Sequence, residues 1–226
     1  MHRVFIRMCL TVVACSFATI VQAQSTTRPA RWDGSVVGGF LVGHSQVSDS
    51  ELYSDDTYGT GEVAVTVGRY WTTHFKTEVS ISGSGEGELY AQRFLTTAPP
   101  NGRYPVFSQH FVSTRAVALT ANWQFFDNDW VHPFVHAGVS VDIDRSRVYA
   151  PRQTYFTGDP RLSSQEVVVT EERREGPTST THLRPTVGVG VKVYITPRVF
   201  FRSDAQTIFG SELTRLTFRG GLGVDF

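Results

Sequence analysis

Three histidines are the first residues of this chain whose type and spacing could do chemistry. His132, His136 and His182 occupy the polar parity of extended, alternating segments, so they would project from one face of a sheet. Histidine binds metal ions readily, but no cysteine or acid stands at ligand spacing from these three. The pattern favours buried histidines that polar neighbours satisfy, and we expect no metal site.

A histidine–serine pair is the closest approach to a hydrolytic site: His44 and Ser45 are followed by Asp49 and Glu51. A lipid-modifying enzyme would need serine, histidine and an acid gathered together. Adjacent residues of a strand point to opposite faces, so His44 and Ser45 would not act together. We interpret the pair as the polar start of a loop, and we expect no catalytic residues and no cofactor.

Twelve charged residues form another group, because all of them fall on the polar parity of alternating segments. They are six acids and six bases: Glu62, Lys76, Glu78, Asp142, Asp144, Arg184, Lys192, Arg202, Asp204, Arg215, Arg219 and Asp225. An unpaired buried ion is very costly, so charges that share a small interior must pair with one another. The balanced set predicts a plugged, salt-bridged lumen.

The elements that position these residues have a period of two from residue 34 to the end of the chain. Eight alternating segments cover residues 34–44, 61–71, 74–83, 110–126, 130–145, 180–195, 198–209 and 212–226. Most exceed the usual soluble strand of about 5–6 residues and match the roughly 9–11 residues of a tilted membrane strand.

The connections between these segments differ in length on the two sides of the expected sheet. Three are tight turns, whereas those at about 45–60, 84–109 and 146–179 are long and are interpreted as loops. Short turns on one side and long loops on the other are typical of outer-membrane barrels. The sequence therefore predicts an all-β fold, an eight-stranded antiparallel up-and-down transmembrane β-barrel.

The amino terminus predicts export. Residues 1–23 combine a basic start, a largely apolar stretch and small residues at its end, which is the pattern of a secretory signal peptide. Residues 24–33 are expected to form a short periplasmic segment, and residues 34–226 the barrel domain. The chain has 21 basic and 21 acidic residues, and this balance argues against nucleic acid as a partner.

Aromatic residues gather near the predicted tight turns. Trp71, Trp123 and Trp130 lie within a few residues of a turn, and Trp32 precedes the first segment. The same regions contain Tyr70, Phe75, Phe125, Phe126, Tyr194, Phe200 and Phe201. Indole and phenol rings prefer the membrane interface, so we expect an aromatic girdle at the periplasmic end.

Two arginines, Arg69 and Arg115, fall on the apolar parity near opposite ends of the barrel. Long basic side chains can extend from a lipid-facing position to the interface. We expect Arg69 to reach the periplasmic interface and Arg115 to meet lipid phosphate at the other edge.

Three stretches resemble the small OmpA/OmpX-like outer-membrane β-barrel family. A strand–turn–strand of that family looks like residues 131–139 (VHPFVHAGV) together with Phe125 and Phe126, which precede the predicted turn. Residues 187–194 (VGVGVKVY) resemble its penultimate hairpin. Residues 220–226 (GGLGVDF) are similar to its terminal strand. The resemblance implies the cell outer membrane, and it implies that Phe226 is the signal read by the barrel-assembly machinery.

From these patterns we expect a non-enzymatic outer-membrane protein with a structural or surface-interaction role, acting through long extracellular loops. A narrow porin-like channel for small solutes and a lipid-modifying outer-membrane enzyme are the alternatives. The expected partners are outer-membrane lipid, lipopolysaccharide and the barrel-assembly machinery, and the chain is expected to be a monomer.

Overall fold

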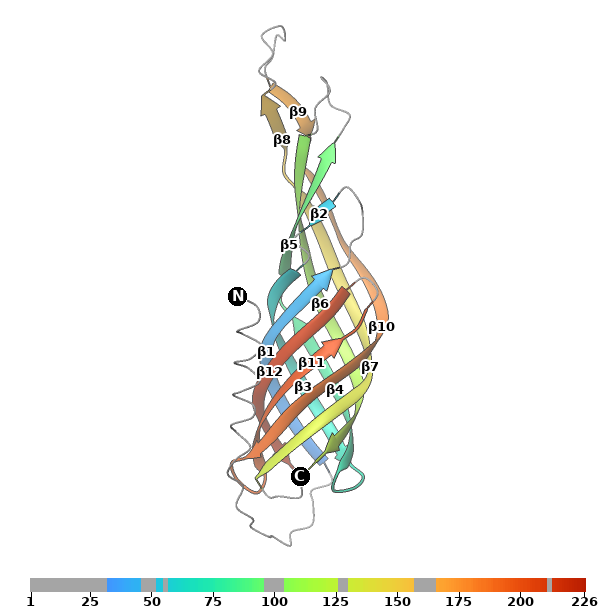
Figure 1. The fold of residues 1–226 in the computed structure, drawn as a ribbon, viewed down its shortest axis with the longest axis vertical. Coiled ribbons are helices and arrows are strands. Elements are labelled where there is room, and N and C mark those ends of the chain that lie inside the picture. Colours follow the sequence, from blue (N-terminus) through green and yellow to red (C-terminus); the bar gives the residue numbers. More distant parts are fainter. Residues whose placement is uncertain are drawn as a thin grey trace.

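Eight long strands form a closed antiparallel barrel, and a narrower sheet rises from one of its ends (Figure 1). The computed structural model describes residues 32–45, 52–54, 57–95, 104–125, 130–156, 166–210 and 213–226. The signal peptide predicted over residues 1–23 lies outside this part of the chain. No helix among the described residues is long and apolar enough to cross a membrane.

The barrel wall follows the order of the sequence. Its strands are β1 (Trp32–Ser45), β3 (Thr57–Tyr70), β4 (Phe75–Ser84), β6 (Tyr104–Gln124), β7 (Val131–Ala150), β10 (Arg173–Tyr194), β11 (Val199–Ile208) and β12 (Leu213–Asp225). Each pairs with the next, and β12 pairs with β1 to close the ring. The predicted fold class is confirmed.

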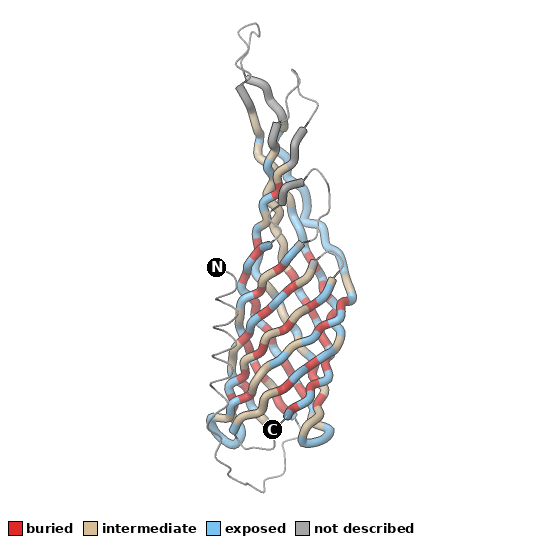
Figure 2. Tube along the Cα trace, viewed as in Figure 1, coloured by how far each residue is buried: buried red, intermediate tan, exposed pale blue. Residues whose placement is uncertain are grey.

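Within the barrel, burial alternates along the wall strands, as Figure 2 shows by its red and pale blue segments. On β3, Val63, Val65 and Val67 are 60%, 50% and 46% exposed, whereas Ala64 and Thr66 between them are 1% and 2% exposed. Large apolar side chains therefore cover the outside of the barrel, and polar side chains fill its inside. Such an inside-out distribution is stable only where the outer face meets lipid.

Tight connections close one end of the barrel, which we call the turn end. At Trp71 and Ile195 the chain reverses through backbone hydrogen bonds of 2.9 Å to Phe75 and 2.8 Å to Val199. The first and last strands meet at this end, where Trp32 and Phe226 exchange two backbone hydrogen bonds of 3.1 and 2.9 Å. Strand β1 thus begins two residues before the predicted start of the barrel domain.

The opposite end continues into sheet, so the prediction of loops over about 45–60, 84–109 and 146–179 is wrong in large part. Strands β6, β7 and β10 run past the barrel, and β5 (Gly87–Leu95) pairs with β6. The short strand β2 (Leu52–Ser54) pairs with β5, whereas β8 (Gln153–Phe156) and β9 (Glu166–Thr170) pair with each other in a separate two-stranded sheet. On β5 the buried positions include the small residues Gly87 and Ala91, while Tyr90 is exposed, so hydropathy does not mark the two faces of this strand.

Candidate functional site: the charged interior

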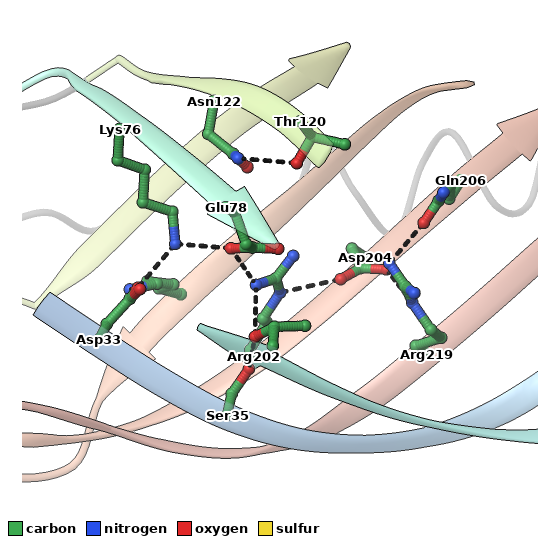
Figure 3. Close-up of polar contacts among 12 residues, drawn as sticks. Asp33, Ser35, Lys76, Glu78, Thr120, Asn122, Arg202, Asp204, Gln206 and Arg219 are labelled. Carbon is green, nitrogen blue, oxygen red and sulfur yellow. Dashed lines mark hydrogen bonds and ion pairs between the residues drawn. The ribbon is translucent and has the colours of Figure 1, made fainter. Parts of the chain in front are cut away.

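A cluster of acids and lysines lies in the lumen near the turn end, and Figure 3 shows three of its members, Asp33, Lys76 and Glu78. Asp33 of β1 accepts hydrogen bonds from two ammonium groups, Lys76 of β4 at 2.6 Å and Lys192 of β10. Lys76 also lies 2.8 Å from a carboxylate oxygen of Glu78. Gly68 of β3 makes room for this cluster, because a Cβ at that position would lie 2.2 Å from Asp33 Oδ1.

Arg202 of β11 links this cluster to the middle of the lumen (Figure 3). Its guanidinium donates to Glu78 at 2.7 Å and to Asp204 at 2.9 Å, and it is 1% exposed. Arg219 of β12 donates to Asp204 at 2.7 Å and to Gln206 at 2.6 Å. The charges therefore form one chain of ion pairs across β4, β11 and β12.

A second cluster lies toward the extension. Arg184 of β10 donates to Asp142 at 3.0 Å and to Asp144 at 2.6 Å. Arg215 of β12 donates to Asp142 and lies 3.7 Å from Asp144, while Thr114 donates to Asp144 at 2.7 Å. Asp142 has no exposed surface, and its pairing from two sides offsets the cost of burying its charge.

Aromatic and aliphatic side chains occupy the space between and around these clusters. The hydroxyl group of Tyr70 accepts a hydrogen bond of 2.7 Å from Lys192, and the Lys192 ammonium lies 3.9 Å from the ring centroid of Phe200, which has no exposed surface. At the extension end, Leu41 and Tyr58 pack together with exposures of 2% and 4%. Side chains therefore fill these parts of the interior, as expected for the size of an eight-stranded barrel.

The structure places all twelve charged residues predicted from the sequence on the inner face, and eleven of them are buried, with Asp225 half-buried. Glu62 takes part in none of the ion pairs among the described residues, and its Oε2 has no hydrogen-bond partner there. Sequence reasoning missed Asp33, the acid that binds both lysines. Asp33 follows Trp32 directly, so it points to the face opposite that of the exposed indole ring, and this was the available signal. Asp33 lay before the first predicted segment, however.

The four tryptophans lie at the turn end on the outer face, with exposures of 41%, 55%, 49% and 51% for Trp32, Trp71, Trp123 and Trp130. The guanidinium of Arg69 lies 4.3 Å from the ring centroid of Trp71 and 5.5 Å from that of Trp32. Three other predicted girdle residues are wrong: Tyr70 and Tyr194 have inward positions, and Phe200 is buried in the lumen. Each shares its even parity with the inward charged residues of its own strand, β3, β10 or β11, and this parity explains the difference.

The histidines do not gather into a site. His136 is 4% exposed inside the barrel, and the ring of His132 packs edge-on against Tyr194 with centroids 5.2 Å apart. Among the described residues, no three His, Cys, Asp or Glu side chains lie where they could hold a metal ion. His44 is exposed at the end of β1, while Asp49 and Glu51 lie outside the described residues.

Solved structures with this architecture are known, although no protein-family model and no curated protein matches the sequence. Neisserial surface protein A (NspA) has a TM-score of 0.53 at 12% identity, over 88% of this chain and 100% of NspA. OprG from Pseudomonas aeruginosa has a TM-score of 0.49 at 10% identity, over 90% and 99%. Ail, the attachment invasion locus protein of Yersinia pestis, has a TM-score of 0.47 at 10% identity, over 87% and 99%.

The closed wall, the apolar outer face and the paired interior together define an integral membrane β-barrel of the smallest size. The likeness to NspA shows the same fold. This fold agrees with the resemblance of the sequence to the small OmpA/OmpX-like outer-membrane barrels.

Proposed function

We propose that this chain is a surface-interaction protein, anchored by a plugged barrel and acting through the sheet that extends beyond it. The observation that carries this proposal is a group of exposed aromatic rings on the extension. Tyr90 of β5 and Phe107 of β6 are 52% and 47% exposed. Tyr90 pairs with Gln109, so Phe107 is its diagonal neighbour on the same face of the sheet.

An arginine continues this group toward the barrel. Phe111 lies on the same face as Phe107, and the guanidinium of Arg147 lies 4.5 Å from its ring centroid. Aromatic residues and arginine are enriched in the cores of protein interfaces. Large apolar rings held in water above a membrane protein favour a protein partner, because burying them there releases water from apolar surface.

A cell-adherence assay tests this role. Cells that display the protein are expected to adhere to an epithelial monolayer in greater numbers than cells carrying an empty vector. The double variant Tyr90→Ser/Phe107→Ser is expected to return adherence to the background, because it removes the two exposed rings while both strands keep their backbone pairing.

The control is Phe209→Ser, which removes a 45% exposed aromatic ring from the short β11–β12 connection at the same end of the barrel. This variant should adhere like the native chain. Equal heat-modifiable migration on a detergent gel shows that each variant is folded. Undiminished adherence of the folded double variant would contradict the proposal.

A narrow channel for small solutes is the alternative function, and the filled lumen argues against it. Bulky side chains such as Arg202 and Phe200 are at most 1% exposed in the interior. Purified, folded protein in a planar lipid bilayer is therefore expected to give no stable single-channel openings above the membrane baseline. Reproducible openings of one size would show that the interior is not a plug.

Three further expectations are part of the proposal. The chain is non-enzymatic, which the burial of most inner acids and bases in ion pairs supports. It acts as a monomer, since each wall strand already pairs on both sides within the barrel. Phe226, 65% exposed at the end of the terminal strand, serves as the signal for the barrel-assembly machinery.

A further inference from the structure

Three arginines lie close together on the outer face of the barrel, where the apolar belt ends. Arg115 of β6 faces Ile143 across the strand pair, and Arg145 follows Ile143 by two residues on the same face of β7. Such diagonal neighbours are roughly 7–8 Å apart. Arg147 lies two residues further along β7, at a spacing of about 7 Å. We call these three residues the arginine patch.

The arginine patch adjoins residues that face lipid. One row closer to the turn end, strands β4, β6, β7 and β10 carry Ile81, Val117, Val141 and Leu183, which are 62%, 50%, 44% and 71% exposed. Arg115 directly follows this row and lies opposite Gly83, where a Cβ would meet nothing within 4 Å. Its side chain therefore starts at the edge of the belt beside open space, at the depth of lipid headgroups.

The described residues balance the charge of the arginine patch only in part. Arg147 lies 2.7 Å from Glu86, but Arg115 and Arg145 form no ion pair with any described residue. The next acid on this face is Glu88, which is paired across the ladder with Phe111 rather than with either arginine. Two diagonal like charges repel each other, so a bound anion would lower the free energy of this region.

The neighbours of Arg145 suit a phosphate group. Ser113 and Ser179 flank it on β6 and β10, and both residues are small and carry a hydroxyl group. The guanidinium group binds phosphate oxygens in a forked geometry that a lysine does not reproduce. We propose that the arginine patch binds the phosphate groups of a lipid headgroup in the outer leaflet, because the patch is continuous with the lipid-facing belt.

The experiment compares thermal unfolding midpoints of the refolded full barrel in neutral detergent micelles. Three probes are added separately: bis-phosphorylated lipid A, the same lipid without its phosphates, and inorganic phosphate. Lipid A is expected to raise the midpoint in a saturable way. The variant Arg115→Gln/Arg145→Gln should weaken this effect about 10-fold or more in lipid concentration, the loss of at least one charge-assisted hydrogen bond.

The matched control is Arg173→Gln/Arg174→Gln, which removes the same charge from exposed arginines of β10 farther from the belt. It should respond to lipid A like the native barrel. The variant Arg115→Lys/Arg145→Lys keeps the charge and loses the forked guanidinium, so it should bind lipid A with intermediate strength. It also provides a second test if the glutamine variant does not fold.

Equal stabilisation by the lipid without phosphates would overturn the proposal, since binding would then depend on the acyl chains. Full stabilisation by inorganic phosphate alone would show that the patch binds free phosphate rather than a lipid headgroup. An equal loss of the lipid A effect in the control variant would show that the binding site is not the arginine patch. The adherence test does not change Arg115 or Arg145, so failure of the proposed function and failure of this site are distinguishable.

Discussion

Replacing Arg202 with methionine is expected to lower the free energy of unfolding by about 3–5 kcal/mol, because buried carboxylates lose their counter-charge. The Arg202 guanidinium lies 2.7 Å from Glu78 and 2.9 Å from Asp204. Methionine fills much of the same space but donates no hydrogen bond to either acid. Urea unfolding in detergent micelles, followed by tryptophan fluorescence, measures the change.

Two further variants make this result specific. Arg174→Met removes an arginine that lies 2.8 Å from Glu172 while both side chains are at least half exposed, so its effect should stay within about 1 kcal/mol. Adding Glu78→Gln to Arg202→Met should recover part of the lost free energy of unfolding, since it removes one of the two carboxylates that lose their arginine partner. If Arg202→Met unfolds like the native barrel, water reaches this arginine and the interior is not a plug.

A basic residue placed on the outer face of the barrel is also expected to have a large effect on stability. Leu119→Arg is expected to destabilise the barrel by about 2–4 kcal/mol, the range for a basic residue at the bilayer midplane. Leu119 is 54% exposed and is flanked by Val79 on β4 and Val139 on β7, both of them outward and apolar. Urea unfolding of the variant in lipid vesicles measures the change.

Ile195→Arg is the matched control for Leu119→Arg. Ile195 is 59% exposed, but it lies in a tight turn at the turn end, where a charge costs about 0–1 kcal/mol. Equal destabilisation of the two variants would mean that depth in the bilayer does not matter, and the outer face would then not be a lipid-facing surface.

The faces of the wall strands could be predicted from the sequence, because lipid and a packed polar lumen impose opposite demands on alternate residues. Val63 and Glu62 are adjacent in the chain, yet one is 60% exposed and the other 8%. An antiparallel sheet of a soluble protein commonly packs one face on the core and leaves the other in water. Here the outer face requires apolar side chains and the inner face requires polar side chains that pack together. The signal therefore persists over every strand that crosses the membrane.

The partners within the lumen could not be predicted in the same way. Alternation tells which face a residue occupies but not its height, which depends on strand register and tilt. Lys192 and Asp33 are 159 residues apart in the chain and meet only because the barrel closes through β12 and β1. The equal numbers of inward acids and bases predicted that they form ion pairs, but they did not show which residues pair.

The extension escaped prediction for a different reason. Strand β5 buries the small residues Gly87 and Ala91 and exposes the aromatic ring of Tyr90, so hydropathy does not separate its two faces. Strand β5 is held by backbone pairing with β6, which leaves no trace in side-chain type, and by the packing of Leu89 against Leu41 and Tyr58. The proposed interaction surface lies in the part of the chain where the sequence pattern is weakest.

Alternate residues of one strand meet lipid and the packed interior, and the methyl groups of β6 test this arrangement without any substitution. Val117 and Leu119 are 50% and 54% exposed, whereas Ala116 and Ala118 are 8% and 4% exposed. In a methyl-labelled barrel in lipid nanodiscs, nuclear Overhauser effects to acyl-chain methylenes are expected for Val117 and Leu119 and for neither alanine. Acyl-chain contacts at the alanines, or water contacts at Val117 and Leu119, would contradict the account.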